Sequence, residues 1–360
     1  MIPYEGWDRE YAANKHVYLE LFDNFMQEAN YEDNSEFEFV LAAKIGRKHC
    51  VSVANATDAL YFSLLAHGIG PGDEVLVTDF SWISSASCVS MTGATPVFCD
   101  IDLSTYHMSL DSIRRMYSDK AQAIVYPHLF GNMTDTNDIQ NFCSEKGIAF
   151  IEDAAQSVGS SLNGVKAGSI GDCSVFSFNT NKVVAGINGG GVVLTDDKST
   201  ADYVKKLRQH GKDGDFSVLG YNSKMYVLNA RIILFRLEND EHNKKIRQQI
   251  AQQYNYALNP LGVITQHMHD NLEHNYHKYV ARFSSVTARD KAKKALKAKV
   301  HYDKPLSQNS MYNNLNYRSD NRTNSQIASN TVLSLPVHAW LKNDEVCFIV
   351  DTLQEIHNDF

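Results

Sequence analysis

Seven short apolar runs rich in β-forming residues recur from about residue 50 to about residue 195, and their spacing limits the fold most strongly. The runs are CVSV, EVLV, PVFC, AIVY, IAFI, CSVFSF and GGVVLT. Helix-like segments lie between most of them, such as TDALYFSLLAHG, which opens with a Thr/Asp cap and closes on Gly68. This alternation predicts an α/β fold with a mostly parallel seven-stranded sheet, and any ligand site beyond the carboxyl ends of its strands.

The pattern changes after about residue 200. A long, charged, helix-like stretch, RIILFRLENDEHNKKIRQQIAQQY, is followed by a tail whose apolar runs are short. We therefore expect a large domain over residues 1–235 and a smaller C-terminal α/β domain over residues 236–360. The lysine-rich run DKAKKALKAK predicts a helix face in contact with solvent.

Charge and composition exclude several classes of partner. The 34 basic and 42 acidic residues give a net charge of −8, which disfavours binding to nucleic acid or to an anionic membrane. The start, MIPYEGWDRE, lacks the features of a signal peptide, and no apolar run approaches the roughly 20 residues that a bilayer crossing needs. The six cysteines form no C-x-x-C pair and predict free thiols in a reducing, cytoplasmic compartment.

Two residues that follow predicted strands could carry chemistry together. Asp153 ends the run in IAFIEDAAQS, where a helix N-cap is the structural alternative. Lys182 follows CSVFSF, and a single lysine there is most often a solvated side chain. We expect both to lie at one edge of the sheet. A lysine that forms an imine and a carboxylate that keeps a pyridine ring protonated are the two groups that a pyridoxal phosphate enzyme most needs.

Other residues could hold the rest of such a cofactor. In SVANATDAL a predicted strand gives way to a helix at Asn55, Ala56, Thr57 and Asp58, where hydroxyl and backbone N–H groups could bind a phosphate. Ser177, five residues before Lys182, could add a second hydroxyl. Trp82 and Phe80 in TDFSWISSAS offer a flat face to the ring, with core packing as the alternative for Trp82.

Ordered blocks along most of the chain resemble one known family. They are SVANATDALYFSLLAHGIGPGDEVLVTDFSWISSAS, TGATPVFCDID, HLFGN, IEDAAQSVGS, GSIGDCSVFSFNTNK, LRQHG, GYNSKM, VHYDKPL and VLSLPVHAW. The sequence resembles the DegT/StrS family of pyridoxal-phosphate-dependent nucleotide-sugar aminotransferases, which have the type I fold of aspartate aminotransferase. The resemblance implies that fold for the whole chain.

The resemblance also implies a role for each matching residue. Lys182 would hold pyridoxal 5'-phosphate (PLP) through an imine and later move a proton, and Asp153 would pair with the pyridine nitrogen. Gln156 would lie near the phenolic oxygen of the ring, and Trp82 would stack on the ring. The implied phosphate ligands are Ala56, Thr57 and Ser177, with Asn222 reaching in from a second subunit.

The implied reaction is a transamination in amino-sugar biosynthesis, as for the O-antigen of lipopolysaccharide. L-Glutamate would give its amino group to a nucleotide-linked keto-6-deoxy sugar, and SFNTNK resembles relatives that aminate the 4-position more than the 3-position. The resemblance implies a cytoplasmic homodimer with its active site at the interface. We expect His128, His301 and Tyr302 on the sugar side of the pocket.

Four residues depart from the family pattern. Ala56 replaces the usual glycine of the phosphate turn, where a methyl group restricts φ. Lys224 replaces an arginine and so lacks the bidentate fork for an anion. Asn179 replaces an aromatic residue or histidine, and Asn188 replaces an acidic residue. These departures affect the expected substrate preference more than the reaction.

Three alternatives remain at this point. A pyridoxamine-phosphate-dependent sugar dehydratase would have a histidine in place of Lys182. A nicotinamide enzyme would need a G-x-G-x-x-G between an early strand and a helix, whereas GINGGGVV precedes a strand. A non-catalytic relative of the fold would bind no cofactor.

Overall fold

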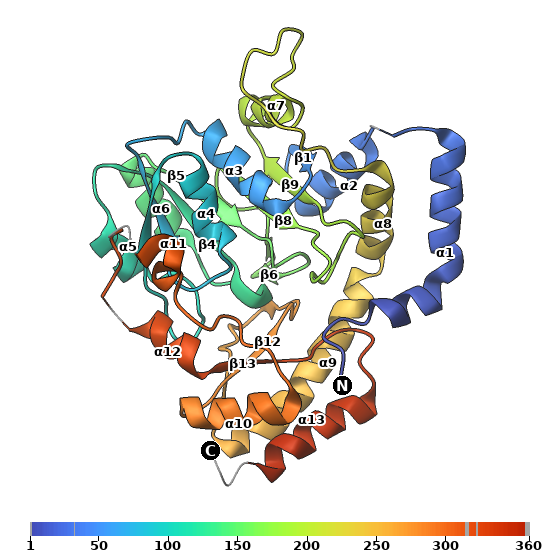
Figure 1. Cartoon of the computed structure of the whole chain (residues 1–360), viewed down its shortest axis with the longest axis vertical. Coiled ribbons are helices and arrows are strands. Elements are labelled where there is room, and N and C mark those ends of the chain that lie inside the picture. The colour runs from blue at the N-terminus through green and yellow to red at the C-terminus, as the bar shows by residue number, and fades with distance from the viewer. Residues whose placement is uncertain (1, 32, 314–316, 322, 357–360) are drawn as a thin grey trace.

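The computed structural model describes residues 2–31, 33–313, 317–321 and 323–356. A seven-stranded sheet forms the centre of its larger part (Figure 1). In spatial order the strands are β1 (His49–Val53), β9 (Gly191–Thr195), β8 (Cys173–Ser177), β5 (Ala149–Asp153), β4 (Ala121–Pro127), β2 (Glu74–Thr78) and β3 (Thr95–Cys99). Each strand corresponds to one of the seven predicted runs, so the predicted sheet is confirmed.

The sheet is mostly parallel, as predicted. Only β9 runs against its neighbours, because it pairs antiparallel with both β1 and β8. In the parallel part Pro127 pairs with Asp153, and Asp153 pairs with Val175. The carboxyl ends of β4, β5 and β8 therefore meet at one edge of the sheet.

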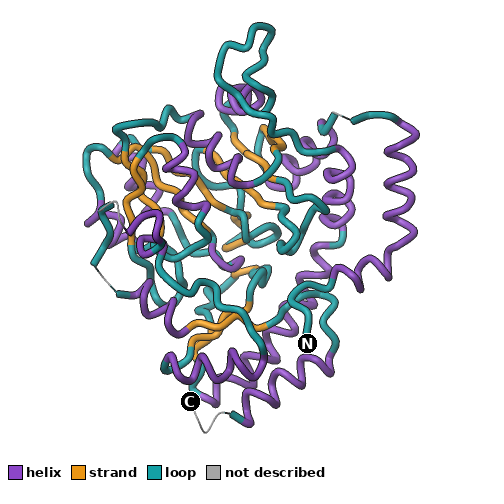
Figure 2. The backbone as a smooth tube through the Cα atoms, in the orientation of Figure 1, coloured by secondary structure: helices purple, strands orange, loops and turns teal. Residues whose placement is uncertain are grey.

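Helices cover both faces of this sheet, as Figure 2 shows. Successive strand residues point to opposite faces: Leu76 packs on one side, and Val75 and Val77 on the other. One face is covered by α2 (Ser35–Ile45), α5 (Leu110–Met116), α6 (Asn137–Lys146) and α8 (Val227–Glu238). The other is covered by α3 (Ala56–Ala66), α4 (Ser84–Met91) and α7 (Lys198–Leu207).

Helix α3 begins slightly earlier than its sequence suggested. The side chain of Asn55 caps it by accepting a hydrogen bond from the Asp58 N–H, so Thr57 and Asp58 lie inside the first turn. Because Asn55 follows β1 almost directly, the helix start is held at the carboxyl edge of the sheet.

The smaller C-terminal part has its own core. Three antiparallel strands, β10 (Ile264–Thr265), β12 (Tyr279–Arg282) and β13 (Val332–Leu335), pack with α9 (Asp240–Leu258), α10 (Val286–Leu296) and α13 (Asn343–Glu355). Helix α12 (Asn324–Thr331) leads into β13. The boundary expected at residues 235–236 falls near the end of α8, just before α9 begins. Ile2 and Tyr4, from the other end of the chain, pack against this core.

The remaining elements connect the two parts. Helix α1 (Trp7–Glu28) runs along one side of the molecule and packs against α8 (Figure 1). A small sheet joins β11 (Leu272–Glu273) to β6 (Ser161–Leu162) and β7 (Val165–Lys166). Short helical turns are η1 (Leu129–Gly131), η2 (Asn259–Leu261), η3 (Leu306–Gln308) and α11 (Ser310–Asn313).

Two smaller expectations also hold in the described residues. All six cysteines are free, and only Cys347 is exposed. The lysines of α10 face solvent, as the sequence predicted. None of the helices in the described ranges combines the length and the apolar character that a bilayer crossing requires.

Candidate active site

A cavity of about 200 Å³ opens at the carboxyl edge of the sheet, where the sequence predicted a site. It brings together residues from distant parts of the chain. The predicted site residues that line it are Ala56, Thr57, Trp82, Asp153, Gln156, Ser177, Lys182, His301 and Tyr302.

Asp153 is a fixed carboxylate in this cavity. It is the last residue of β5 and is only 6% exposed. One carboxylate oxygen accepts a hydrogen bond from the Ala155 N–H and the other accepts one from the Ser85 hydroxyl, both at 3.1 Å. Burial raises the pKa of Asp153, while the Ala155 N–H, the Lys182 charge and the Ser85 hydroxyl oppose that rise. The carboxylate is thus held in one orientation at the cavity wall.

Lys182 presents its amine to the same cavity. It closes a turn after β8, in which its N–H donates to the Asn179 carbonyl at 2.9 Å. Removal of its ammonium from water lowers its pKa to about 8, Asp153 opposes the change, and the nearby charge of Lys278 adds to it. Within the described residues its Nζ has no hydrogen bond or ion pair. A lysine with a lowered pKa and a free amine is suited to act as a nucleophile.

The start of α3 also lines the cavity and has hydrogen-bond donors that suit an anion. The first N–H groups of a helix have no acceptor within the helix, and the Asn55 side chain takes only that of Asp58. The N–H groups of Ala56 and Thr57 therefore remain at the cavity wall, beside a pair of hydroxyls, Thr57 Oγ1 and Ser84 Oγ, that are 2.8 Å apart. This arrangement suits a phosphate.

The glycine run packs against the backbone of this helix start. A Cβ atom added to Gly191 would lie 2.4 Å from the Asn55 carbonyl carbon and 2.6 Å from the Ala56 nitrogen, so only glycine allows this approach. Ala56 itself begins a helix and is not among the described residues with positive φ. Its methyl group is therefore unstrained.

Aromatic and amide groups border the space where a flat ring would lie. Trp82 is 60% exposed at the mouth of the cavity, and its ring centroid is 6.3 Å from that of Tyr302. The Gln156 amide donates to the Tyr302 hydroxyl at 3.2 Å and accepts from the Phe130 N–H at 2.9 Å. Gln156 is thus fixed at the cavity wall, and Trp82 is free of core packing.

His301 also lines the cavity, and its ring is neutral. Burial lowers its pKa to about 3, with the charges of Lys278, Lys299 and Lys182 as further causes. Its Nδ1 lies 2.8 Å from the Ser334 hydroxyl. The residue can therefore offer a ligand a hydrogen bond but no charge.

Two expected residues do not line this cavity: His128, and Asn222, which was expected to reach the cavity of a second subunit. His128 is fully buried, its Nε2 lies 3.0 Å from a Glu152 carboxylate oxygen, and its backbone N–H donates to the Asp153 carbonyl. Its contact with Glu152 holds the ring in the core. A substrate in the cavity would therefore not touch it. Asn222 is exposed and lines a separate groove of about 650 Å³ together with Lys224.

The sequence reasoning missed several residues of the wall, which are Ser81, Ser84, Ser85, Asn181, Gly189, Gly190, His277 and Lys278. The hydroxyl-rich stretch SWISSAS, which also contains Trp82, is a sequence signal for serine hydroxyls at the site. For Lys278 the signal is its position: it is a charged residue directly before the largely buried strand β12.

These groups match the polar features of one cofactor. The Lys182 amine would meet the aldehyde of PLP, the fixed Asp153 carboxylate its pyridine nitrogen, and the N-terminus of α3 its phosphate. The match extends to the sequence, since residues 14–354 match the DegT/DnrJ/EryC1/StrS aminotransferase family. The chain belongs to this family.

Individual relatives of this aminotransferase cover most of the chain. It is 32% identical to UDP-2-acetamido-2-deoxy-3-oxo-D-glucuronate aminotransferase from Pseudomonas aeruginosa, over 89% of each chain. It is 31% identical to GDP-perosamine synthase from Caulobacter vibrioides, again over 89% of each chain. The crystal structure of a DegT/DnrJ/EryC1/StrS aminotransferase from Brucella abortus superposes with a TM-score of 0.93 at 27% identity, covering 99% of this chain and 100% of that one. The protein is a PLP-dependent aminotransferase with the type I fold.

Proposed function

We propose that this protein transfers the amino group of L-glutamate to the keto carbon of a nucleotide-linked keto-6-deoxy sugar, with a 4-keto sugar favoured over a 3-keto sugar. The observation that carries the proposal is the convergence of Lys182, Asp153 and the start of α3 on one cavity. Relatives named for nucleotide-linked sugars support the substrate class.

The residues of this chain have separate tasks in such a reaction. PLP, when bound, supplies the electron sink for the carbanion that forms at the donor's α-carbon. The neutral Lys182 amine can accept the proton from that carbon and return a proton later. The Asp153 carboxylate would stabilise positive charge on the ring nitrogen, and the hydrogen bonds from Ala155 and Ser85 fix its orientation.

The sugar would enter at the open mouth of the cavity. Trp82 is exposed there, while His301 and Tyr302 line the wall, so these three side chains are our candidates for sugar contacts. His128 is not proposed for this role because it packs below the cavity. The preference for the 4-position rests on the SFNTNK motif, since relatives at nearly equal identity are named for a 3-oxo sugar and for perosamine.

We further propose a cytoplasmic homodimer in which Asn222 completes the partner's phosphate site. In its own chain Asn222 lies on a surface segment that also exposes apolar side chains, since Phe216 is 64%, Leu219 85% and Tyr226 70% exposed. Exposed apolar side chains close together are typical of an interface. In Figure 1 the loop after α7 projects away from the body of the molecule.

The alternatives fit the site less well. A dehydratase of this fold would have a histidine where Lys182 lies. A relative that has lost catalysis would have no reason to keep a lysine with a lowered pKa beside a buried carboxylate.

A substrate panel tests the proposal. Holoenzyme would be incubated with L-glutamate and with 3-keto and 4-keto hexoses on dTDP, UDP and GDP, and the amino sugars and 2-oxoglutarate measured. Stoichiometric formation of both products from one 4-keto substrate is expected. Dehydration without amino transfer, or no reaction with any sugar, would contradict the proposal.

A further inference from the structure

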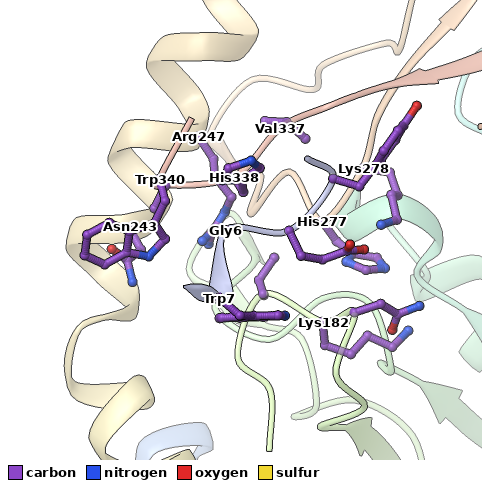
Figure 3. A pocket seen from close by; sticks show the side chains of 15 residues that line it. Gly6, Trp7, Lys182, Asn243, Arg247, His277, Lys278, Val337, His338 and Trp340 are labelled. Atoms are coloured by element: carbon purple, nitrogen blue, oxygen red, sulfur yellow. The ribbon is translucent and has the colours of Figure 1, made fainter. Parts of the chain in front are cut away.

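A second lysine lies beside the catalytic one and has no assigned task. Lys278 is 7% exposed, yet it lines both the main cavity and an adjoining cavity of about 40 Å³ that reaches the N-terminal segment. Lys182 and His277 also line both cavities. In Figure 3 these three residues lie on the same side of the smaller cavity, across from Asn243 and Trp340.

The ammonium of Lys278 is unpaired. Its backbone N–H donates to the Phe130 carbonyl at 3.2 Å, but within the described residues its side chain makes no hydrogen bond or ion pair. Glu5 lines the smaller cavity and attracts the Lys278 ammonium only through its charge, without a hydrogen bond or ion pair, while the charge of Lys299 repels that ammonium. A lysine is seldom buried without a partner, because removing an unpaired charge from water is unfavourable.

His277 supplies a second unsatisfied group at the same place. Its Nδ1 is buried and has no hydrogen-bond partner, while its backbone N–H donates to the Asn275 side chain at 2.8 Å. Burial, with the charges of Lys278 and Lys182 as further causes, lowers the pKa of His277 well below its usual value, so the ring is neutral. The side chains of a cation and of a neutral histidine thus line one small space.

We propose that Lys278 binds a carboxylate of the substrate, with His277 as a second hydrogen-bonding group, and so determines which substrates the enzyme accepts. The inference rests on the proposed transamination. A carboxylate would complement both groups, since it accepts hydrogen bonds and neutralises the ammonium.

The size and position of the space favour a carboxylate over a larger anion. A cavity of about 40 Å³ is far smaller than the roughly 300–1,000 Å³ of pockets that hold larger ligands, so it suits a carboxylate better than a nucleoside diphosphate. The phosphate of the cofactor has its own site at the start of α3. Lys278 lies near enough to Lys182 for its charge to lower the pKa of that amine. The donor's α-carbon must come close to the Lys182 amine, which brings an α-carboxylate within reach of Lys278.

Two carboxylates are available, that of the amino donor and that of an acidic sugar. The test uses holoenzyme of wild type, Lys278→Met, Lys278→Arg and the control Lys299→Met. Lys299 is exposed and lines neither cavity, so its removal takes one positive charge from the region without removing a residue of either wall. KM and kcat are measured for L-glutamate and for keto sugars with and without a carboxylate. Glutarate, a dicarboxylate that cannot react, is titrated by calorimetry.

The donor is the expected source. Lys278→Met should then raise KM for L-glutamate and Kd for glutarate at least about tenfold, with a smaller change in kcat, as expected for loss of a charge-assisted hydrogen bond. Lys278→Arg should recover part of the affinity, and Lys299→Met should match wild type. A rise in KM confined to the carboxylated sugar would support the same role with the sugar as source.

Two results would overturn the proposal. In one, Lys278→Met leaves KM and Kd for every carboxylate unchanged. In the other, Lys278→Met and Lys299→Met change KM and Kd for the carboxylates equally, which would show that only the net positive charge of the region matters. Because glutarate binding requires no turnover, it tests Lys278 even if no keto sugar is aminated and the proposed reaction fails.

Discussion

The Asp153 carboxylate and the Lys182 amine line one cavity, Asp153 from the end of β5 and Lys182 from the segment that follows the adjacent parallel strand β8. Their charges interact: Asp153 opposes the fall in the pKa of Lys182, and Lys182 opposes the rise in the pKa of Asp153. The cavity thus contains an amine that can act as a nucleophile and a carboxylate that can balance the positive charge of a ring nitrogen.

Replacement of Asp153 by asparagine should remove most of the activity without unfolding the protein. The amide keeps the shape but no longer holds a proton on the ring nitrogen, so kcat should fall at least about 100-fold, the size of effect seen when one electrostatic partner of a developing charge is removed. Steady-state kinetics and a thermal melt measure both quantities. The control is Asp79→Asn, a buried carboxylate that follows β2, binds Ser307 and does not line the cavity. Equal rates for Asp153→Asn and wild type would favour a purely structural role for Asp153.

Replacement of Thr57 by valine should weaken binding of the phosphate alone. The hydroxyl lies at the start of α3 beside that of Ser84, and loss of one hydrogen bond to a charged group should raise Kd for PLP about tenfold or more. Pyridoxal, which lacks the phosphate, serves as the control ligand. If Thr57→Val weakened both ligands equally, the α3 site would not be the phosphate site.

The pH dependence of cofactor capture should follow the lowered pKa of Lys182. Only the neutral amine attacks an aldehyde, so capture of PLP by cofactor-free protein should speed up as pH rises through about 8, rather than through 10.5. In Lys278→Met a positive neighbour is lost, which stabilises the protonated form of Lys182 and should move the midpoint to higher pH. Stopped-flow absorbance measures the rate. A midpoint near 10.5 in wild type would show that burial does not lower this pKa.

Mixed dimers should reveal whether Asn222 acts across an interface. Lys182→Ala and Asn222→Ala protomers would be inactive or weakened alone, but a dimer containing one of each has one site with both Lys182 and the partner's asparagine. Mixing the variants after mild dissociation should therefore restore activity. Mixing Lys182→Ala with wild type is the control for exchange. Failure of a mixed dimer, isolated by two affinity tags, to regain activity would contradict the shared site.

The sheet could be predicted from sequence because each strand is a short buried run that alternates with helices, and periodicity reports burial directly. Asp153 and Lys182 could be predicted because parallel strands end at one edge. His128 could not be placed, since it also follows a strand, and only the buried Glu152 carboxylate turns its ring into the core. Lys278 was missed for a related reason: it comes close to Lys182 only when the C-terminal part packs against the large sheet.

The cavity contains two lysines with lowered pKa values, Lys182 and Lys278, and only one can hold the cofactor. Reduction of holoenzyme with borohydride would fix PLP on the lysine that carries it, and peptide mass spectrometry would locate the label. The account predicts a visible absorption band that disappears on reduction, with the label on Lys182 and none on Lys278. A label on Lys278, or no label on either lysine, would contradict it.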